Sequence, residues 1–147
     1  MGQRKGYKYL EHTADVEYVA RGKSIEECFA NALMAMFDTQ SYLGKVSSSK
    51  AKGATIEVKD KASTIQDLLW YTLQDALSLS DSRAVFPYKV SSIKISKKGK
   101  SYAIYAKMLA KEREDGTSKL DIKGVARYNL SLKQNAGGFE ANVVLDV

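Results

Sequence analysis

The sequence predicts an α+β fold, an antiparallel or mixed β-sheet with two α-helices packed on one face. Two segments in the first half of the chain carry apolar residues at the three- and four-residue spacing of amphipathic helices. Short segments of alternating apolar and polar residues, typical of half-buried strands, precede and separate them. A series of hairpin-like segments fills the second half, and this order favours helices on one side of an antiparallel sheet.

Length and composition indicate an ordinary globular protein. The 147 residues are 44% apolar and 27% charged, close to the average for globular domains, so we expect a single domain over residues 1–147. The single cysteine, Cys28, excludes an internal disulfide and favours a reducing compartment. No apolar signal segment opens the sequence, and no stretch approaches the ~20 apolar residues of a membrane span. We therefore predict a cytoplasmic protein without membrane contact.

Two capping boxes predict where the helices begin. In such a box, a side chain at the helix start and another three residues later each bond to a backbone amide of the same turn. A segment rich in Ser, Lys and Gly, residues 44–53, is predicted to be a loop between the helices. The first box is Ser24–Glu27, and its helix is expected to end at residues 38–39. The second box is Ser63–Gln66, and its helix is expected to end at residues 81–83.

Strands are predicted wherever apolar and polar residues alternate between turn signals. The pattern changes to period two after Pro87, the only proline, and it continues to the end of the sequence. The predicted strands are residues 7–10, 15–20, 55–59, 90–95, 102–108, 119–132 and 139–147, with turns at 97–100, 112–117 and 135–138.

The candidates for nucleophilic or acid–base chemistry are few. His12 is the only histidine, so any arrangement of Ser-His-Asp or Cys-His type would have to use it. A capping or turn residue, a metal ligand and a general base all remain open for His12, and the turn role is the default. Cys28 shares the apolar face of the first helix, which favours a buried structural thiol over a cysteine nucleophile.

Carboxylates are the remaining chemistry, because the sequence has no phosphate-binding loop, dinucleotide fingerprint or Cys-x-x-Cys pair. Asp15 opens a predicted strand, and Asp146 precedes the carboxyl group of Val147. Two such aspartates with a terminal carboxylate would form a hard-oxygen site suited to calcium, magnesium or manganese. This site requires a fold that brings residue 15 beside residue 146. From spacing alone, two ordinary solvated charges are the simpler interpretation.

The charge of the chain is strongly basic, with a net +6 at pH 7 and a pI near 9.3. An excess of Lys and Arg favours contact with phosphates, because neutralised phosphates release counterions. A solvated basic surface that keeps the protein in solution is the favoured alternative, since the basic residues are spread along the chain. The densest group, residues 94–100, lies around a predicted turn.

Motifs along nearly the whole chain resemble those of the archease family. The likeness runs in order and at about the right length, and its first and last motifs together are specific. The segments that carry the resemblance are Tyr9-Leu10-Glu11-His12-Thr13-Ala14-Asp15-Val16, residues 22–29, Ala35-Met36-Phe37-Asp38, residues 65–77, Asp121-Ile122-Lys123-Gly124-Val125 and the final Val144-Leu145-Asp146-Val147.

The resemblance implies an α+β fold, a divalent-cation site and a function without catalysis. Archeases are partners of the GTP-dependent RNA ligase that joins tRNA exon halves. They are understood to speed guanylylation of the ligase's active-site histidine and to permit repeated turnover. The resemblance therefore implies that this chain activates such a tRNA-splicing RNA ligase, with indirect contact with RNA as a further expectation.

The resemblance also assigns roles to particular residues. It implies that Asp15, Asp146 and Val147 bind a divalent metal ion, with calcium the ion usually assigned. Lys123 matches a family lysine linked to activation, and His12 lies in the N-terminal motif, so both are expected to serve activation of the partner. Family members often carry a Thr-Tyr-His sequence after the lysine motif, whereas residues 126–128 here are Ala-Arg-Tyr.

Two other functions compete with this interpretation. A basic nucleic-acid-binding or chaperone-like module would use Lys and Arg, with Tyr102, Tyr105 and Tyr128 as stacking surfaces. A metal-dependent hydrolase is the weaker alternative, because the sequence offers no acid–base group beyond His12.

Overall fold

The computed structural model describes residues 6–10 and 15–147, and it confirms the predicted α+β class. Within these residues, eight strands form two antiparallel sheets, accompanied by three helices. The strands are β1 (Tyr7–Leu10), β2 (Val16–Gly22), β3 (Gly53–Ala62), β4 (Val85–Lys98), β5 (Ser101–Glu112), β6 (Gly124–Val125), β7 (Ser131–Asn135) and β8 (Gly138–Asp146). The helices are α1 (Ile25–Gln40), α2 (Leu43–Ser48) and α3 (Ile65–Ser82).

The first sheet has β8 near its centre. The order is β1-β2-β8, and the other side of β8 pairs with β7 along its first half and with β6 at its end. Alternate residues of β2 and β8 face the core and are fully buried, among them Tyr18 opposite Val143 and Ala20 opposite Ala141. This alternation is what the sequence pattern predicts for a strand with one covered face.

The second sheet has the order β3-β5-β4, with β4 and β5 forming a long hairpin. Pro87 lies in β4, an edge strand, where the missing N–H of proline costs no ladder bond. The register of β4 shifts between Pro87 and Lys89 and again between Val90 and Ser92. The hairpin turns at Gly99, whose φ of 59° lies in the left-handed region that glycine adopts without strain.

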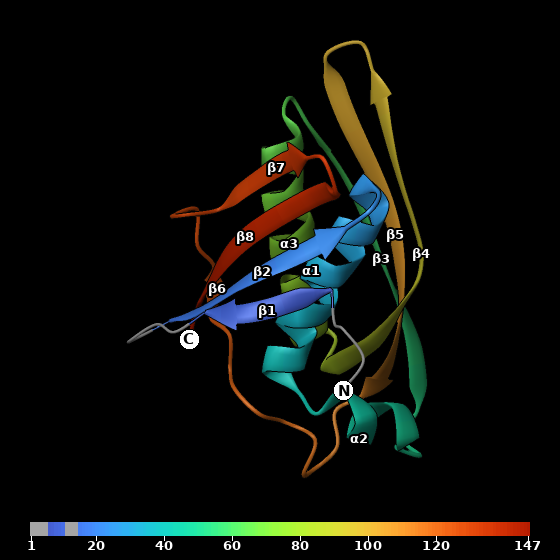
Figure 1. Cartoon of the computed structure of the whole chain (residues 1–147). Coiled ribbons are helices and arrows are strands. Elements are labelled where there is room, and N and C mark those ends of the chain that lie inside the picture. The colour runs from blue at the N-terminus through green and yellow to red at the C-terminus, as the bar shows by residue number, and fades with distance from the viewer. Residues whose placement is uncertain (1–5, 11–14) are drawn as a thin grey trace.

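The two long helices lie between the sheets (Figure 1). Helix α1 contacts β2 and β8 of the first sheet and β4 of the second, while α3 packs on β3 and β5 and reaches β6 and β7. Their inner residues, including Phe29, Phe37 and Leu73, are fully buried. Each sheet thus has the helices on one face, as predicted, but the strands form two sheets where the sequence suggested one. No helix in the described residues is long and apolar enough to cross a membrane.

Both helix starts are capped, although not through the predicted reciprocal bonds. The Ser24 hydroxyl accepts the N–H of Glu27 at 3.1 Å, as expected, but the Glu27 carboxylate accepts the N–H of Lys23 at 3.0 Å instead of that of Ser24. Helix α3, the second of the two helices predicted from the sequence, starts one residue later than predicted. Its cap is Thr64, whose hydroxyl accepts the N–H of Asp67 at 3.0 Å. The role of N-cap thus belongs to the residue directly before each helix.

Two predicted segments are wrong in part. The predicted loop 44–53 contains most of α2, which buries Val46 against the second sheet. The predicted strand 119–132 contains only the short β6 and the first two residues of β7. It is interrupted because Lys119, at its start, donates its N–H to the Gln40 carbonyl oxygen at the end of α1 at 2.9 Å, and because Asn129 adopts a left-handed φ of 58°.

Candidate functional site

The pairing of β2 with β8 brings the two predicted metal-binding aspartates to one end of the same sheet. Val16 is opposite Leu145 in the register, so Asp15 and Asp146 are the next residues on two neighbouring strands. Val147 follows Asp146, and the C-terminus lies beside the start of β2 in Figure 1. Asp146 is exposed, whereas Asp15 and Val147 are half-buried. The fold supplies the proximity that spacing alone left open.

Lys123 is attached to the same end of the sheet through its backbone. Its N–H donates to the carbonyl oxygen of Asp146 at 2.7 Å, and Gly124 is the residue opposite Asp146 in the register. Lys123 is exposed, whereas Ile122, the residue before it, is buried. The segment is thus anchored in the core on one side and presents an ammonium group to solvent on the other.

Side chains of helix α3 bond to the segment that contains Lys123 and Val125. The indole N–H of Trp70 donates to the carbonyl oxygen of Val125 at 2.8 Å, and the side-chain oxygen of Gln74 accepts the Val125 N–H at 3.0 Å. The Arg127 guanidinium lies 3.9 Å from the centre of the Trp70 ring, a cation–π contact. Both backbone groups of Val125 are therefore satisfied by side chains of one helix, which holds Lys123 in a fixed position.

The oxygen donors at this end of the sheet fit a hard divalent cation. Two side-chain carboxylates and the main-chain carboxyl group of Val147 offer the oxygen ligands that calcium and magnesium prefer. No group of three or more His, Cys, Asp or Glu side chains in the described ranges has the spacing to hold a metal ion. The main-chain oxygen of Val147 would therefore have to be the third donor. His12, the other predicted residue, lies outside the described residues.

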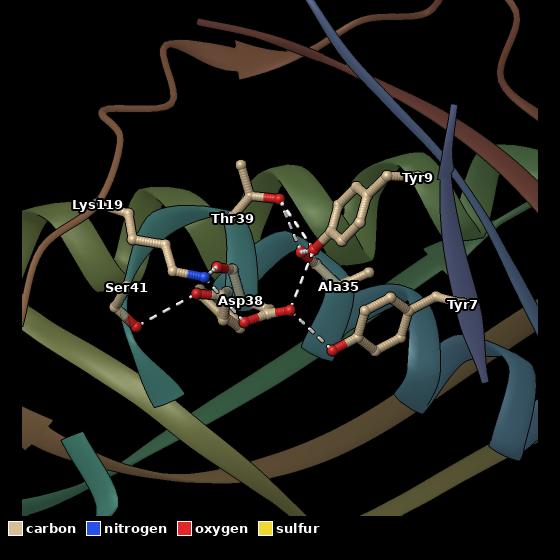
Figure 2. A network of polar contacts seen from close by, with 8 residues as sticks. Tyr7, Tyr9, Ala35, Asp38, Thr39, Ser41 and Lys119 are labelled. Atoms are coloured by element: carbon tan, nitrogen blue, oxygen red, sulfur yellow. Dashed lines mark hydrogen bonds and ion pairs between the residues drawn. The ribbon is translucent and has the colours of Figure 1, made fainter. Parts of the chain in front are cut away.

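A polar network that the sequence did not point to is centred on Asp38 at the end of α1 (Figure 2). The Tyr7 hydroxyl donates to Asp38 Oδ2 at 3.0 Å, and Lys119 Nζ lies 3.2 Å from Oδ1 in an ion pair. The Tyr9 hydroxyl donates to the Ala35 carbonyl oxygen at 2.9 Å and lies 3.4 Å from Asp38 Oδ2. The network joins β1, α1 and the segment before β6.

The two tyrosines of this network are held in their neutral, donating form. Burial raises the pKa of Tyr9 to about 12; the hydrogen bond with Thr39 opposes this rise, and the charge of Asp38 adds to it. Burial, followed by the hydrogen bond to Asp38, also raises the pKa of Tyr7. Tyr7 and Tyr9 therefore act as hydrogen-bond donors to α1 throughout the physiological range.

A shallow depression of ≈ 380 Å³ connects this network with Asp15, one of the predicted metal ligands. It is lined by Asp15 and Val16 from the start of β2 and by Tyr9, Asp38 and Lys119 among others. A second carboxylate, Asp38, thus borders the same depression as Asp15, with its charge compensated by Lys119. The only sequence signal that could have found it is its place in the segment 35–38 of the family resemblance, since an aspartate near a helix end is otherwise common.

Cys28 has the structural role that the sequence predicts. Its side chain is fully buried on α1, and Sγ donates to the Ala20 carbonyl oxygen at 3.6 Å. Burial raises the pKa of the thiol to about 12. A thiol that is buried and protonated at neutral pH is not a nucleophile.

Comparison with known proteins agrees with the resemblance seen in the sequence. Residues 7–147 match the model of the Archease protein family (MTH1598/TM1083). Protein archease of Methanosarcina mazei is 33% identical over 147 residues, which cover 99% of this chain and 98% of the relative. Protein archease of Methanothermobacter thermautotrophicus is 26% identical, covering 97% of this chain and 99% of the relative.

Solved structures share the fold. The solution structure of protein 1598 of Methanobacterium thermoautotrophicum has a TM-score of 0.79 at 25% identity, covering 98% of this chain and 100% of the other. The crystal structure of an archease from Thermotoga maritima, described as a possible chaperone, has a TM-score of 0.61 at 20% identity, with 100% and 99% coverage. Since the family model and relatives above 30% identity both span nearly the whole sequence, this chain belongs to the archease family.

Proposed function

We propose that this protein is a non-catalytic activator of a GTP-dependent tRNA-splicing RNA ligase and acts through a divalent cation bound by Asp15, Asp146 and Val147. The observation that carries the proposal is the register of β2 and β8, which makes Asp15 and Asp146 neighbours at one end of the first sheet. The choice of partner is an inference from the likeness to archeases, which are understood to activate that ligase.

Within this proposal, the chain's own residues provide charge and position. Asp15 and Asp146 offer carboxylate oxygens, the main-chain carboxyl group of Val147 adds a third donor, and calcium is the ion we expect. A divalent cation, when bound, would neutralise negative charge on a nucleotide triphosphate and so ease phosphoryl transfer in the partner. The exposed position of Asp146 gives a partner access to this end of the sheet.

Lys123 and His12 are proposed to act on the partner. Lys123 is exposed, and its backbone bond to Asp146 keeps its ammonium group at the same end of the sheet as the carboxylates. An ammonium group there can contact a phosphate or carboxylate of the ligase. The role of His12 rests on its place in the N-terminal motif alone, and stays a prediction. We further propose a cytoplasmic location, because Cys28 is a free thiol, as expected in a reducing compartment.

The experiment is a multiple-turnover ligation assay with the cognate ligase, GTP and paired tRNA exon halves, with and without this protein. The proposal predicts that ligation continues past one turnover only when the protein and a divalent cation are both present. An active ligase whose turnover number does not change on addition of the protein would contradict the proposal. Joining of RNA ends by the protein alone would show that it is an enzyme, against its assignment as an activator.

A further inference from the structure

The outward face of the second sheet carries a dense group of lysines. Helices α1 and α3 cover one face of the β3-β5-β4 sheet (Figure 1). Alternate residues of its strands are buried, and the residues between them lie on the opposite, outward face. In the register, Lys59 is opposite Tyr105, which is in turn opposite Lys94, so two lysines flank one tyrosine across the sheet. Lys111 shares this alternation, but its Nζ donates to the Ser47 carbonyl oxygen at 2.8 Å. The other six outward lysines, which we call the basic face, are Lys59, Lys61, Lys89, Lys94, Lys98 and Lys107.

The charge of the basic face is not neutralised by neighbouring acids. The four ion pairs between described residues lie elsewhere in the molecule. Among the outward positions of β3, β4 and β5, Glu57 is the one acidic residue, and its Oε1 accepts the Tyr105 hydroxyl at 2.7 Å. Six lysines against one glutamate give this surface a charge close to the net +6 of the whole chain.

Tyr105 lies in the middle of the basic face with its ring accessible. The residue is 36% exposed, and Lys59 Nζ lies 5.2 Å from the centre of the ring. Outward residues two apart on a strand are roughly 7 Å from each other, and neighbouring strands are about 5 Å apart. The lysines therefore form a grid of positive charge around one aromatic side chain. The sequence also suggested Tyr102 and Tyr128 for stacking. Tyr102 has the same alternation as the buried residues of β5 and so lies on the other face of the sheet, and Tyr128 lies outside this sheet.

We propose that the basic face binds the backbone of single-stranded RNA, with a base stacked on Tyr105. Lysines in a grid suit a flexible chain of phosphates, and an aromatic ring in a basic groove or face accepts unpaired bases of any sequence. A duplex would leave Tyr105 without a base to stack on. A membrane surface is less suitable, because Leu109, a large aliphatic residue at an outward position, is half-buried and so cannot insert deeply among lipids.

The basic face and the two aspartates, Asp15 before β2 and Asp146 at the end of β8, are on different sheets, with α1 and α3 between them. RNA held on the basic face therefore leaves Asp15 and Asp146 free for a partner. The choice of RNA over DNA rests on the proposed function in tRNA splicing, whereas the basic face itself rests on the structure alone. Binding to RNA can thus fail without any consequence for ligase activation, and the reverse also holds.

The test is a fluorescence anisotropy titration of a labelled 15-nucleotide oligouridylate with the full chain, without ligase, over a range of salt concentrations. The test variant is Lys59→Gln/Lys94→Gln/Lys107→Gln. The matched control, Lys23→Gln/Lys50→Gln/Lys133→Gln, removes the same charge from exposed positions outside the basic face. We expect the test variant to bind at least about tenfold more weakly at low salt. The slope of log affinity against log salt should fall by about 2, since single strands give roughly 0.7 per phosphate contact.

Two tyrosine variants test the stacking. Tyr105→Leu should weaken binding by about fivefold or more, whereas Tyr105→Phe should bind like the wild type, because stacking on an aromatic ring contributes roughly 1–3 kcal/mol per base. A circular dichroism melt of every variant confirms that it is folded at the temperature of the titration. If Tyr105→Leu bound the oligouridylate as tightly as the wild type, this would overturn the proposal that a base stacks on Tyr105.

Other outcomes would overturn the proposal as a whole. Equal weakening in the two triple variants would mean that total charge, not the basic face, attracts RNA. Unchanged binding by the test variant would place the RNA elsewhere. Affinity for a uridylate–adenylate duplex equal to that for the single strand would exclude a single-strand site, and equal affinity for the matching oligodeoxythymidylate would exclude a preference for RNA. Binding to phosphatidylserine vesicles without binding to the oligonucleotide would identify a membrane surface.

Discussion

Lys123 donates its backbone N–H to the carbonyl oxygen of Asp146 at 2.7 Å. This bond joins the segment that the archease resemblance links to activation with the strand that ends in the proposed metal ligands. Lys123 and the carboxylates are therefore carried by the same end of the first sheet. The bonds of Val125 to Trp70 and Gln74 of α3 hold the Lys123 segment there, so removing one of them should loosen it.

Gln74→Ala should loosen the Lys123 segment without touching the metal ligands. The variant removes the side-chain oxygen that accepts the Val125 N–H, which leaves that donor without its partner and should lower the free energy of unfolding by about 1 kcal/mol. Hydrogen exchange should accelerate at residues 123–126. The matched control is Gln66→Ala, which removes the oxygen that accepts the Leu132 N–H of β7. If hydrogen exchange at residues 123–126 accelerated as much in Gln66→Ala as in Gln74→Ala, this would contradict the role of Gln74 in holding the segment.

Asp146→Asn should weaken the binding of calcium. The amide keeps the shape of the side chain but removes one negative charge from the proposed ligand set, so we expect a loss of affinity of about tenfold or more in a calorimetric titration. Asp121→Asn is the control, because it removes the charge of an exposed carboxylate that is close in sequence to Lys123 but not proposed as a ligand. Equal calcium affinity in Asp146→Asn and the wild type would remove Asp146 from the site.

A carboxyl pair between β3 and α3 should make the stability of the protein depend on pH. Burial, followed by the hydrogen bond and the charge of Asp75, raises the pKa of Asp60 to about 7, and Asp60 Oδ2 is buried without a donor. Because the pKa in the folded state lies above the ordinary 3.8, the stabilising contribution is complete below about pH 4. It is lost as the pH rises through about 7.

The variant Asp60→Asn tests this pair, because its amide can donate to Asp75 at any pH. Urea unfolding at pH 8 should give a free energy of unfolding about 1 kcal/mol above that of the wild type. At pH 4 the two proteins should be nearly equal. Asp115→Asn, in an exposed turn, should leave the pH dependence unchanged. If the free energy of unfolding of the wild type does not change between pH 4 and 8, this would contradict the raised pKa of Asp60.

Gly22→Ala should destabilise the contact between β2 and α1. A Cβ at this position would lie 2.3 Å from the Cys28 nitrogen and 2.7 Å from the Glu27 carbonyl carbon, both backbone atoms that cannot move independently. We expect a loss of about 3 kcal/mol in chemical unfolding. Gly44→Ala is the control, since no atom lies within 4 Å of its added Cβ. Similar stability of Gly22→Ala and the wild type would show that the strand and helix can shift apart.

Local sequence signals predicted the fold where one side of an element is buried and its start is marked. The pattern around Phe29 and Leu33 predicted α1, because its apolar residues recur at three- and four-residue spacing and form one buried face. The same reasoning failed for residues 119–132. There the backbone N–H of Lys119 donates to the carbonyl oxygen of Gln40, more than seventy residues earlier, and no local pattern encodes such a long-range bond.

The candidate site could be predicted only in part for the same reason. Spacing did not show that Asp15 and Asp146 are neighbours, because the register of β2 and β8 depends on how the whole sheet assembles. The family resemblance supplied that relationship. Asp38 was not singled out by the sequence, since its role depends on Tyr7 and Lys119, which approach it from β1 and from the segment before β6.

The most direct test of the account is the rate at which the cognate RNA ligase becomes guanylylated, measured in single-turnover experiments with labelled GTP and a divalent cation. We predict that the wild-type protein and Asp121→Asn accelerate guanylylation equally. Asp15→Asn/Asp146→Asn should accelerate it at least about tenfold less, because it lacks both carboxylates of the proposed site. Acceleration by the double variant equal to that of the wild type would contradict activation through Asp15 and Asp146.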